Sequence, residues 1–440
     1  NYGANAVFAI LDDYISDPQA MPNYNAIPEE DKAVMETAQT MADGHTYSLS
    51  LYEPETWNVT PNRMFINRAW LDKLGLDMPT TTDELKEVLI AFRDGDPNGN
   101  GIKDEIGIYG WQSGTYGQNI IAALMNSFEF WNGGTQNGGL ALAEDGKTVI
   151  APFTQEGWKE GLRYMNDLYN ESVLSASTFT DSDTQYRATL NEETNCVALT
   201  SSGSLSSWPD AANNKNFLEM ELMEPLTGPE GKQYTPYTEY SPNQTAFIFE
   251  GTDNMDLAIR FLDEFYDSYT SIVSRFGEEG VDWTQDPEFL ATTSNSYIAE
   301  GIYDAPFLSY ISNQWQEITN VTWKSTNPRY ATLEEMNSVT NGNVEFNPED
   351  PTQLNAKNEV YYYDKHPEKV LPLLHYTVEE SNEIQQAVTN IPDYVNQSMA
   401  RFITGDLSID TDWDTYLSNL ENMGLSQWLE TAQEAYNRSL

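Results

Sequence analysis

Segments with strand-like and helix-like patterns alternate along most of this 440-residue chain, and the alternation limits the possible folds more than any other feature. Short apolar runs at 64–66, 106–109, 197–199 and 246–249 are typical of buried strands. Between them, apolar residues recur every three or four positions, as in amphipathic helices. From about Val378 the helical pattern continues to the end of the chain. The sequence therefore predicts an α/β fold with extra C-terminal helices.

Two segments show the helical pattern most clearly. Thr81 and Glu84 stand three residues apart at the start of the first, the spacing of a capping box. The second follows Asn254, a residue type that favours the N-cap position. The apolar residues that we expect these helices to bury are Leu85, Val88, Leu89 and Phe92 in the first, and Leu257, Ala258, Phe261, Leu262 and Phe265 in the second.

The chain is strongly acidic, with 69 Asp and Glu residues against 22 Lys and Arg and a net charge of −47. Such a charge repels phosphate backbones and anionic lipid headgroups, which argues against nucleic acid as a partner. A single cysteine, Cys196, excludes an intrachain disulfide, and three histidines argue against a zinc centre. No apolar run reaches the roughly 20 residues that span a bilayer.

One short loop has the composition of a metal site. Gly101, at loop position 6, permits a tight turn, and Ile102 would offer its backbone carbonyl. Position 12, where an EF-hand has a bidentate Glu, is Gly107, so Glu105 would have to serve instead. A structural calcium ion and an Asx-turn loop without metal are the two interpretations. The oxygen side chains at positions 1, 3, 5, 9 and 10 are Asp96, Asn98, Asn100, Asp104 and Glu105.

Aromatic residues are numerous, with 11 Trp and 26 Tyr, and several lie in polar loops next to predicted strands. Sugars stack their apolar faces on flat rings while polar side chains bind their hydroxyl edges, so this setting suits a sugar pocket. Packing of each ring in a partly buried position is the alternative for any single residue. The tryptophans in this setting include Trp57, Trp111, Trp208 and Trp283.

Enzyme motifs are absent from the sequence: it has no G-x-S-x-G, H-E-x-x-H, Walker or G-x-G-x-x-G pattern. With 69 carboxylates, a glycosidase pair of acids can be neither excluded nor identified. A secreted glycosidase or lyase therefore stays open as an alternative function, as does a surface protein that binds no small ligand.

Several motifs resemble one family, the extracellular solute-binding proteins of ABC sugar importers. The branch that they resemble includes alginate-binding proteins and many lipoproteins of Gram-positive bacteria. The matches extend from about Ala42 to Tyr436 and do not specify the sugar. The segments that carry the resemblance are 65–76, 79–85, 91–94, the loop that begins at Asp96, 276–283, 402–406, 412–416 and 423–425.

The resemblance implies a periplasmic-binding-protein-like clamp of two discontinuous α/β domains that closes by a hinge motion on an oligosaccharide. We expect the first domain to hold 1–108 plus 246–305 and the second to hold 109–245 plus 306–440. The family role is to deliver the sugar to permease subunits in the membrane, as a monomer and without catalysis. The family's calcium loop maps onto Asp96, Asn98, Asn100, the Ile102 carbonyl, Asp104 and Glu105.

Within this scheme we rank the candidate sugar contacts. Trp111, Trp208 and Trp283 are the leading stacking platforms, and Trp57 and Tyr116 come next. Hydrogen bonds to the sugar are expected from Gln112, Arg275 and Glu53. Because basic residues are so few, we expect a neutral oligosaccharide rather than a polyanion such as alginate.

The start of the chain lacks a signal peptide, since Asn1 opens without basic and apolar segments. Members of the family begin with a signal peptide, a lipid-modified cysteine and a strand–helix–strand unit, and the match here begins after that unit. We therefore expect part of the first domain to be missing from this chain. The expected location is extracellular, with lipid anchoring through a removed N-terminal segment, or periplasmic.

Overall fold

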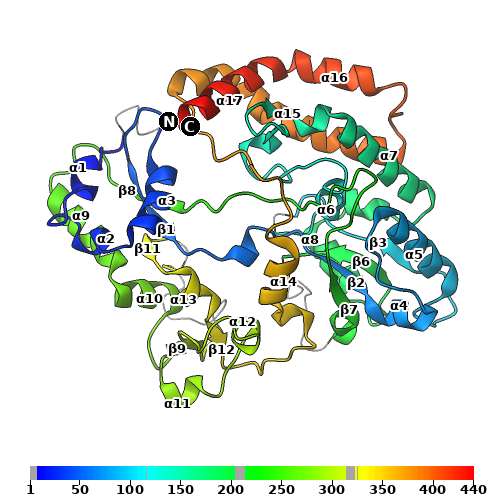
Figure 1. Ribbon diagram of the computed structural model, residues 1–440, viewed down its shortest axis with the longest axis horizontal. Coiled ribbons are helices and arrows are strands. Elements are labelled where there is room, and N and C mark those ends of the chain that lie inside the picture. The colour runs from blue at the N-terminus through cyan, green and yellow to red at the C-terminus, as the bar shows by residue number, and fades with distance from the viewer. Residues whose placement is uncertain (1–6, 115, 204–213, 314–322, 325) are drawn as a thin grey trace. The chain divides into compact units, whose positions relative to one another are not determined.

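The structure is a computed structural model that describes residues 7–114, 116–203, 214–313, 323–324 and 326–440. The chain divides into two compact units (Figure 1). Unit 1 consists of Asn1–Thr56, Tyr240–Asn347 and His375–Asn382. Unit 2 consists of Trp57–Glu239, Pro348–Leu374 and Glu383–Leu440.

The sheet of unit 1 has the order β11-β1-β8. Strand β1 (Ser48–Tyr52) lies in the centre and all five of its residues are buried. It pairs in parallel with β11 (Arg329–Tyr330) and antiparallel with β8 (Asn243–Phe247). A second sheet is built from β9 (Trp283–Thr284), β10 (Ser309–Tyr310) and β12 (Thr340–Asn341). The helices of unit 1 are α1 (Asp12–Ile15), α2 (Pro22–Asn25), α3 (Glu29–Gln39), α9 (Met255–Asp263), α10 (Ser268–Phe276), α11 (Pro287–Leu290), α12 (Ser296–Ala299) and α13 (Leu333–Asn337).

The sheet of unit 2 has the order β3-β6-β2-β7. Strands β3 (Ile106–Ile108) and β6 (Val197–Ser201) are parallel, whereas β2 (Met64–Asn67) is antiparallel to both β6 and β7 (Met220–Met223). A hairpin of β4 (Ala141–Leu142) and β5 (Val149–Ile150) stands apart from this sheet. The helices are α4 (Arg68–Leu74), α5 (Thr82–Gly95), α6 (Ile120–Met125), α7 (Glu156–Asn170), α8 (Asp183–Leu190), α14 (Asn355–Tyr362), α15 (Val378–Thr404), α16 (Trp413–Asn422) and α17 (Leu425–Ser439).

These units differ from the expected domains at two main places. Residues 57–108 were expected in the first domain, but β2 and β3 hydrogen-bond into the unit 2 sheet and carry this segment with them. Residues 306–347 were expected in the second domain, but β10 pairs with β9 and β11 pairs with β1, both in unit 1. Strand pairing therefore sets the boundaries, and pairing between distant segments cannot be seen in a hydrophobic pattern.

The four predicted strands are present as β2, β3, β6 and β8. The capping box of α5 is also present: Thr81 Oγ1 accepts the Glu84 N–H at 3.2 Å, and Glu84 Oε2 accepts the Thr81 N–H at 3.2 Å. Its apolar stripe, Leu85, Val88, Leu89 and Phe92, is buried as predicted.

The predicted buried face of α9 is right only in part, since Ala258 and Leu262 pack against the core of unit 1 but other members of the stripe do not. Leu257 is 68% exposed and Phe261 is 57% exposed, while Ile259 and Asp263 are buried. The reason is a polar contact, because the Asp263 carboxylate accepts the backbone N–H of Tyr24 at 2.9 Å. Holding the amides at the start of α2 satisfies donors that a helix N-terminus leaves open. This turns the Asp263 side of α9 inward.

The C-terminal helices α16 and α17 belong to unit 2, together with α15 from Glu383 onward (Figure 1). Phe402 of α15 contacts Trp413 and Tyr416 of α16, with ring centres 6.0 and 5.6 Å apart. Helix α17 packs on the β4–β5 hairpin, where Gln433 Oε1 accepts the Val149 N–H at 2.8 Å. Within the described ranges, none of the helices has the length and apolar character needed to cross a membrane.

The close approach at Gly117 yields a stability prediction. Gly117 has φ +79°, and an added Cβ would overlap the carbonyl oxygen of Pro61. Gly231 has φ +81° but no atom within 4 Å of its added Cβ. Both Gly→Ala changes should lower the free energy of unfolding by roughly 1–2 kcal/mol, because alanine is strained at a positive φ. Only Gly117→Ala adds a backbone clash, so we expect it to lose about 2 kcal/mol more than Gly231→Ala.

Urea unfolding followed by circular dichroism measures both changes. Equal losses for the two variants would show that the segment at Pro61 can move away at little cost.

Candidate functional site

Chain segments that are distant in sequence lie next to one another at one end of the strands of the unit 2 sheet. We call this end of the strands the edge. Because β2 is antiparallel to its neighbours, its first residue, Met64, pairs with the last residues of β6 and β7, Ser201 and Met223. Strand β3 runs parallel to β6, so its carboxyl end lies at the same edge. In open α/β sheets, ligands bind outside the carboxyl ends of the strands. The described residues next to these strand ends are 57–63 before β2, 109–114 and 116–118 after β3, and 202–203 after β6.

Trp57 is held at this edge by Arg63. The Arg63 guanidinium carbon lies 5.3 Å from the centre of the Trp57 ring, within the range of a cation–π contact. Arg63 Nη2 also donates to the Trp57 carbonyl at 2.9 Å, and Nε donates to the Thr60 carbonyl at 3.1 Å. The arginine is fully buried whereas the tryptophan is partly exposed. The buried Arg63 side chain therefore contacts one face of the Trp57 ring and fixes the orientation of that ring.

The segment after β3 supplies three more predicted contacts, Trp111, Gln112 and Tyr116, all partly exposed. The Trp111 N–H donates to the Gln118 carbonyl at 2.9 Å, and Gln118 Oε1 accepts the Tyr116 N–H at 2.8 Å. Gln112 Nε2 donates to the carbonyl of Asn396 on α15 at 3.2 Å. These bonds fix the backbone at Trp111 and Tyr116. The Trp111 ring packs partly against the core that contains Phe65 and Tyr109, so only part of its surface is open to a ligand.

Two other predicted contacts, Glu53 and Arg275, lie together in unit 1. Glu53 directly follows β1, and its carboxylate accepts Arg329 Nε at 2.5 Å and Nη2 at 3.2 Å. Arg275 Nε, from α10, lies 3.5 Å from Glu53 Oε1. The Arg329 side chain is 1% exposed and that of Glu53 is 10% exposed. Such a buried pair is stable only with further hydrogen bonds, which Arg329 makes to Asn327 Oδ1 and the Lys324 carbonyl.

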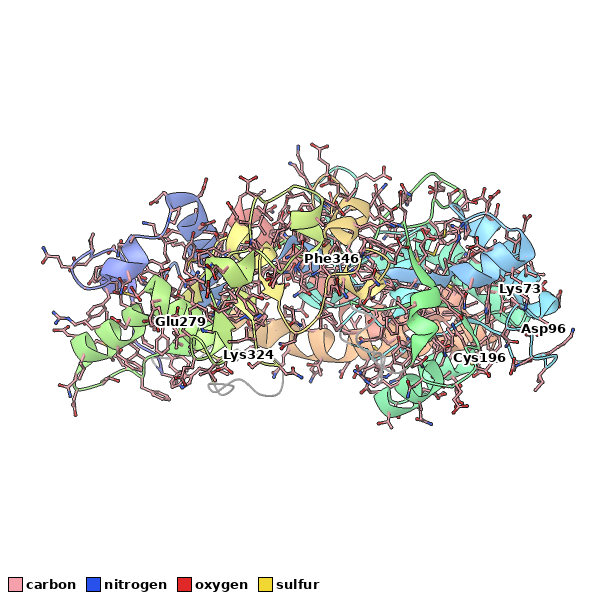
Figure 2. All side chains as sticks on the ribbon, turned by 90° about the horizontal axis from the view of Figure 1, so that it is seen from below. Lys73, Asp96, Cys196, Glu279, Lys324 and Phe346 are labelled. Atoms are coloured by element: carbon pink, nitrogen blue, oxygen red, sulfur yellow. The ribbon has the colours of Figure 1, made fainter. Side chains whose placement is uncertain are left out.

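Burial in this cluster shifts the pKa of two neighbouring groups. Burial raises the pKa of Glu55 from 4.5 to about 7; Arg275 opposes the shift and Glu53 adds to it. Burial also lowers the pKa of Lys324 to about 8, and the charges of Arg275 and Arg329 lower it further. Lys324, labelled in Figure 2, is 4% exposed as a residue. Sequence reasoning missed Arg329 and Lys324, because only pairing of β11 with β1 brings them to Glu53.

The last two predicted platforms differ from the rest. Trp283 is 1% exposed, packs in a core with Phe276 and Tyr310, and donates from Nε1 to the Gly277 carbonyl at 2.8 Å. Its ring therefore serves the core of unit 1 and offers no face to a ligand in this structure. Trp208 lies outside the described residues.

The predicted calcium loop follows α5 directly. Asp96 is the C-cap of the helix, and its Oδ1 accepts the backbone N–H of Gly99 at 3.1 Å. Asp104 accepts the side-chain amides of Asn98 and Asn100, each at 2.8 Å. Lys73 lies close to Asp96 (Figure 2). The Lys73 Nζ donates a hydrogen bond to the Pro97 carbonyl at 2.7 Å. The loop is thus a set of Asx turns around a central carboxylate.

The donor set of this loop fits a hard cation. Glu105 Oε1 is buried, and no described residue supplies it with a hydrogen bond. Burial raises the pKa of Glu105, and the nearby carboxylates of Asp104 and Asp96 raise it further, so three acids gather here. Calcium binding would require Asn98 and Asn100 to turn their amide oxygens inward. Across the described residues, no group of three or more His, Cys, Asp or Glu side chains is already arranged as a metal site.

Comparison with known proteins places this geometry in context. No family model matches the chain. The chain is 27% identical over its full length to the fructooligosaccharide ABC transporter substrate-binding protein FusA of Streptococcus pneumoniae serotype 4, of which it covers 77%. The chain is therefore a homologue of this substrate-binding protein. It is also 25% identical, over 59% of its length, to lipoprotein LipO of Bacillus subtilis, of which it covers half.

Solved structures of such proteins share the fold of this homologue. FusA in complex with kestose superimposes with a TM-score of 0.74 at 24% identity, over 99% of this chain and 84% of that one. The HMO-binding solute-binding protein from Bifidobacterium longum infantis gives 0.75 at 22% identity, with the same coverage. Alginate-binding protein AlgQ2 gives 0.62 at 20% identity, over 99% and 83%.

These similarities confirm three expectations from the sequence. The family resemblance is correct, and the two-domain solute-binding fold with extra C-terminal helices is correct. The expectation of a binding protein rather than an enzyme is also confirmed, because FusA and the related structures are substrate-binding proteins.

The raised pKa of Glu55 predicts a pH dependence of stability. The folded state holds the Glu55 proton up to about pH 7, whereas the unfolded chain releases it near 4.5. The folded state therefore binds more protons between these values, and its stability falls as the pH rises through them. We expect Glu55→Gln to remove this contribution, so that its unfolding temperature falls less than that of the wild type over the same interval.

Thermal unfolding at several pH values measures the effect. Glu250→Gln, which changes an exposed carboxylate of the same unit, is the control and should follow the wild type. A Glu55→Gln profile parallel to the wild type would contradict the assignment.

Proposed function

We propose that this homologue is the substrate-binding component of an ABC importer and binds an oligosaccharide. The observation that carries the proposal is that Trp57, before β2, and Trp111, Gln112 and Tyr116, after β3, are partly exposed and lie in segments next to the same end of the unit 2 sheet. Two indole rings and a phenol ring can stack on sugar faces, and the amide can bind hydroxyl groups. FusA, a fructooligosaccharide-binding protein, supports the same class of ligand.

We further propose that the sugar is neutral. At this edge, Arg63 is fully buried and already donates to the Trp57 and Thr60 carbonyls. Lys365, whose side chain is 30% exposed, already lies 4.0 Å from the carboxylate of Glu224, the residue after β7, and donates to Gln233 Oε1. Recognition of a polyanion calls for exposed arginine or lysine side chains that can pair with carboxylates. The net charge of −47 would also repel such a ligand over a distance.

A structural calcium ion in the 96–105 loop is part of the proposal. Asp96, Asn98, Asn100, Asp104 and Glu105 would supply side-chain oxygens and Ile102 its carbonyl. One of the related structures is an EF-hand mutant of FusA, with a TM-score of 0.71 at 22% identity. The ion would hold the turn between α5 and β3, the strand that leads to Trp111.

The cellular setting follows from the proposed role. We infer an extracellular protein held at the membrane by a lipid anchor, in line with lipoprotein LipO as a relative. Its partners would be the oligosaccharide and the permease subunits that receive it, and it would act as a monomer.

The first prediction from this function concerns binding. The wild type should bind at least one neutral oligosaccharide of a panel that includes kestose and nystose, measured by isothermal titration calorimetry. Trp111→Ala should weaken that binding at least tenfold, because it removes a stacking surface worth about 1–2 kcal/mol or more. Tyr269→Ala, on α10 of unit 1 and 56% exposed, is the matched control and should bind as the wild type does.

Two results would overturn the functional proposal. One is the absence of binding to every sugar in the panel. The other is the release of reducing ends from the sugars during prolonged incubation, which would favour the secreted glycosidase or lyase instead.

The second prediction concerns calcium. Addition of calcium to chelator-treated protein should raise the unfolding temperature, since a ligand at 100 times its dissociation constant stabilises by about 2.7 kcal/mol. Asp104→Asn should abolish most of this rise because it removes the central carboxylate. Asp145→Asn, an acid in a different Asx turn of unit 2, should keep it. Identical melting of the wild type with calcium and with chelator would show that the loop is an Asx turn only.

A further inference from the structure

A cavity of about 110 Å³ lies in unit 1 and is lined by residues of that unit. Its walls come from α10, from β11 with the residues that follow it, and from the first turns of α13. Glu53, Arg275 and Arg329 are among its lining residues, with side chains 10%, 12% and 1% exposed. Ser268 lines it as well and is exposed, so the cavity has a mouth at the start of α10.

The size of the cavity suits one small molecule. A single water occupies roughly 10–15 Å³ by the same measure, so the space corresponds to about seven to eleven water positions. A hexose ring with its hydroxyl groups needs a space of this order. A chain of several sugar residues would exceed it.

The charges of the lining favour a neutral occupant. Two acids, Glu53 and Glu335, face two bases, Arg275 and Arg329. Arg329 already binds both carboxylate oxygens of Glu53. An ion entering such a balanced site would bring a buried charge without a free partner, which is costly. A neutral molecule can accept from the guanidinium groups and donate to the carboxylates without changing this balance.

The remaining lining has the mixed character of a sugar site. Aromatic rings of Phe276, Phe307 and Tyr330 stand beside the hydroxyl groups of Ser268 and Thr332. Tyr330 is fixed in place, because its ring stacks on Tyr52 at 5.5 Å and its hydroxyl donates to Asp31 at 2.6 Å. The Thr332 hydroxyl also donates to Glu335 Oε2 at 3.1 Å. Aromatic rings together with charged and hydroxyl groups in one lining match the apolar faces and polar edges of a sugar ring.

We propose that this cavity binds one neutral monosaccharide unit, free or as one residue of a longer sugar. The choice of ligand class rests on the proposed oligosaccharide-binding function. The sugar enters past Ser268 and places its hydroxyl groups against Glu53, Arg275 and Arg329. The charged cluster of unit 1 is then a determinant of which sugars the protein accepts.

Filling the cavity tests the proposal. Ala331 lines it, and its backbone N–H binds the Tyr52 carbonyl whatever the side chain, so Ala331→Trp fills the space while β11 stays paired. We expect Ala331→Trp to weaken kestose binding at least tenfold in calorimetry and to abolish the ligand-observed NMR signals of D-fructose and D-glucose. Ser268→Phe, which blocks the exposed mouth, should give the same result if Ala331→Trp fails to fold. Ala291→Trp, at an exposed position of unit 1, should bind as the wild type does.

The outcomes separate this proposal from the function on which it rests. A wild type that binds no sugar overturns both. A wild type that binds kestose, together with blocked variants that bind it equally well, overturns the cavity proposal alone. A crystal structure of the sugar complex gives the direct result: a sugar ring in the cavity supports the proposal, and water molecules alone overturn it.

Discussion

The antiparallel placement of β2 between β6 and β7 decides the organisation of unit 2. It brings the segment before β2 to the same sheet edge as the segments after β3 and β6. A parallel β2 would send Trp57 to the opposite edge, away from Trp111 and Tyr116. The backbone around the edge is crowded, as the approach of Gly117 to Pro61 and Gly203 shows. The direction of β2 therefore determines that Trp57 lies at the same edge as Trp111 and Tyr116.

Unit 1 depends on a different interaction, the ion pair between Glu53 and Arg329. The two residues are 276 positions apart in sequence and meet because β11 adds in parallel to β1. Once buried, the pair imposes conditions on its surroundings, since every remaining donor of Arg329 must find an acceptor. The Asn327 side chain and the Lys324 carbonyl supply them. The raised pKa of Glu55 and the lowered pKa of Lys324 are further effects of the same burial.

Local signals in the sequence predicted local structure well. The capping box at Thr81, the buried stripe of α5 and the strands β2, β3, β6 and β8 depend on residues close together in the chain. The Asx turns of the 96–105 loop belong to the same class. In α9 the helical period was right, and Ala258 and Leu262 pack inward as predicted, but Leu257 and Phe261 face outward. Asp263 instead turns inward, because it binds amides of a segment about 240 residues away. Periodicity identifies a helix, whereas long-range polar contacts choose which side of it turns inward.

The sequence by itself determined the class of fold, the family resemblance, the loop of oxygen ligands and the acidity that argues against nucleic acid as a partner. It also named Trp57, Trp111, Gln112 and Tyr116, yet it ranked Trp283 beside them. Only the tertiary structure decided that the first four share one sheet edge while Trp283 fills a core and binds Gly277. It also decided the boundaries of the two units and brought Arg329 and Lys324 to Glu53. The physical reason is that strand pairing and burial bring together residues hundreds of positions apart. The local pattern of apolar and polar residues does not predict those contacts.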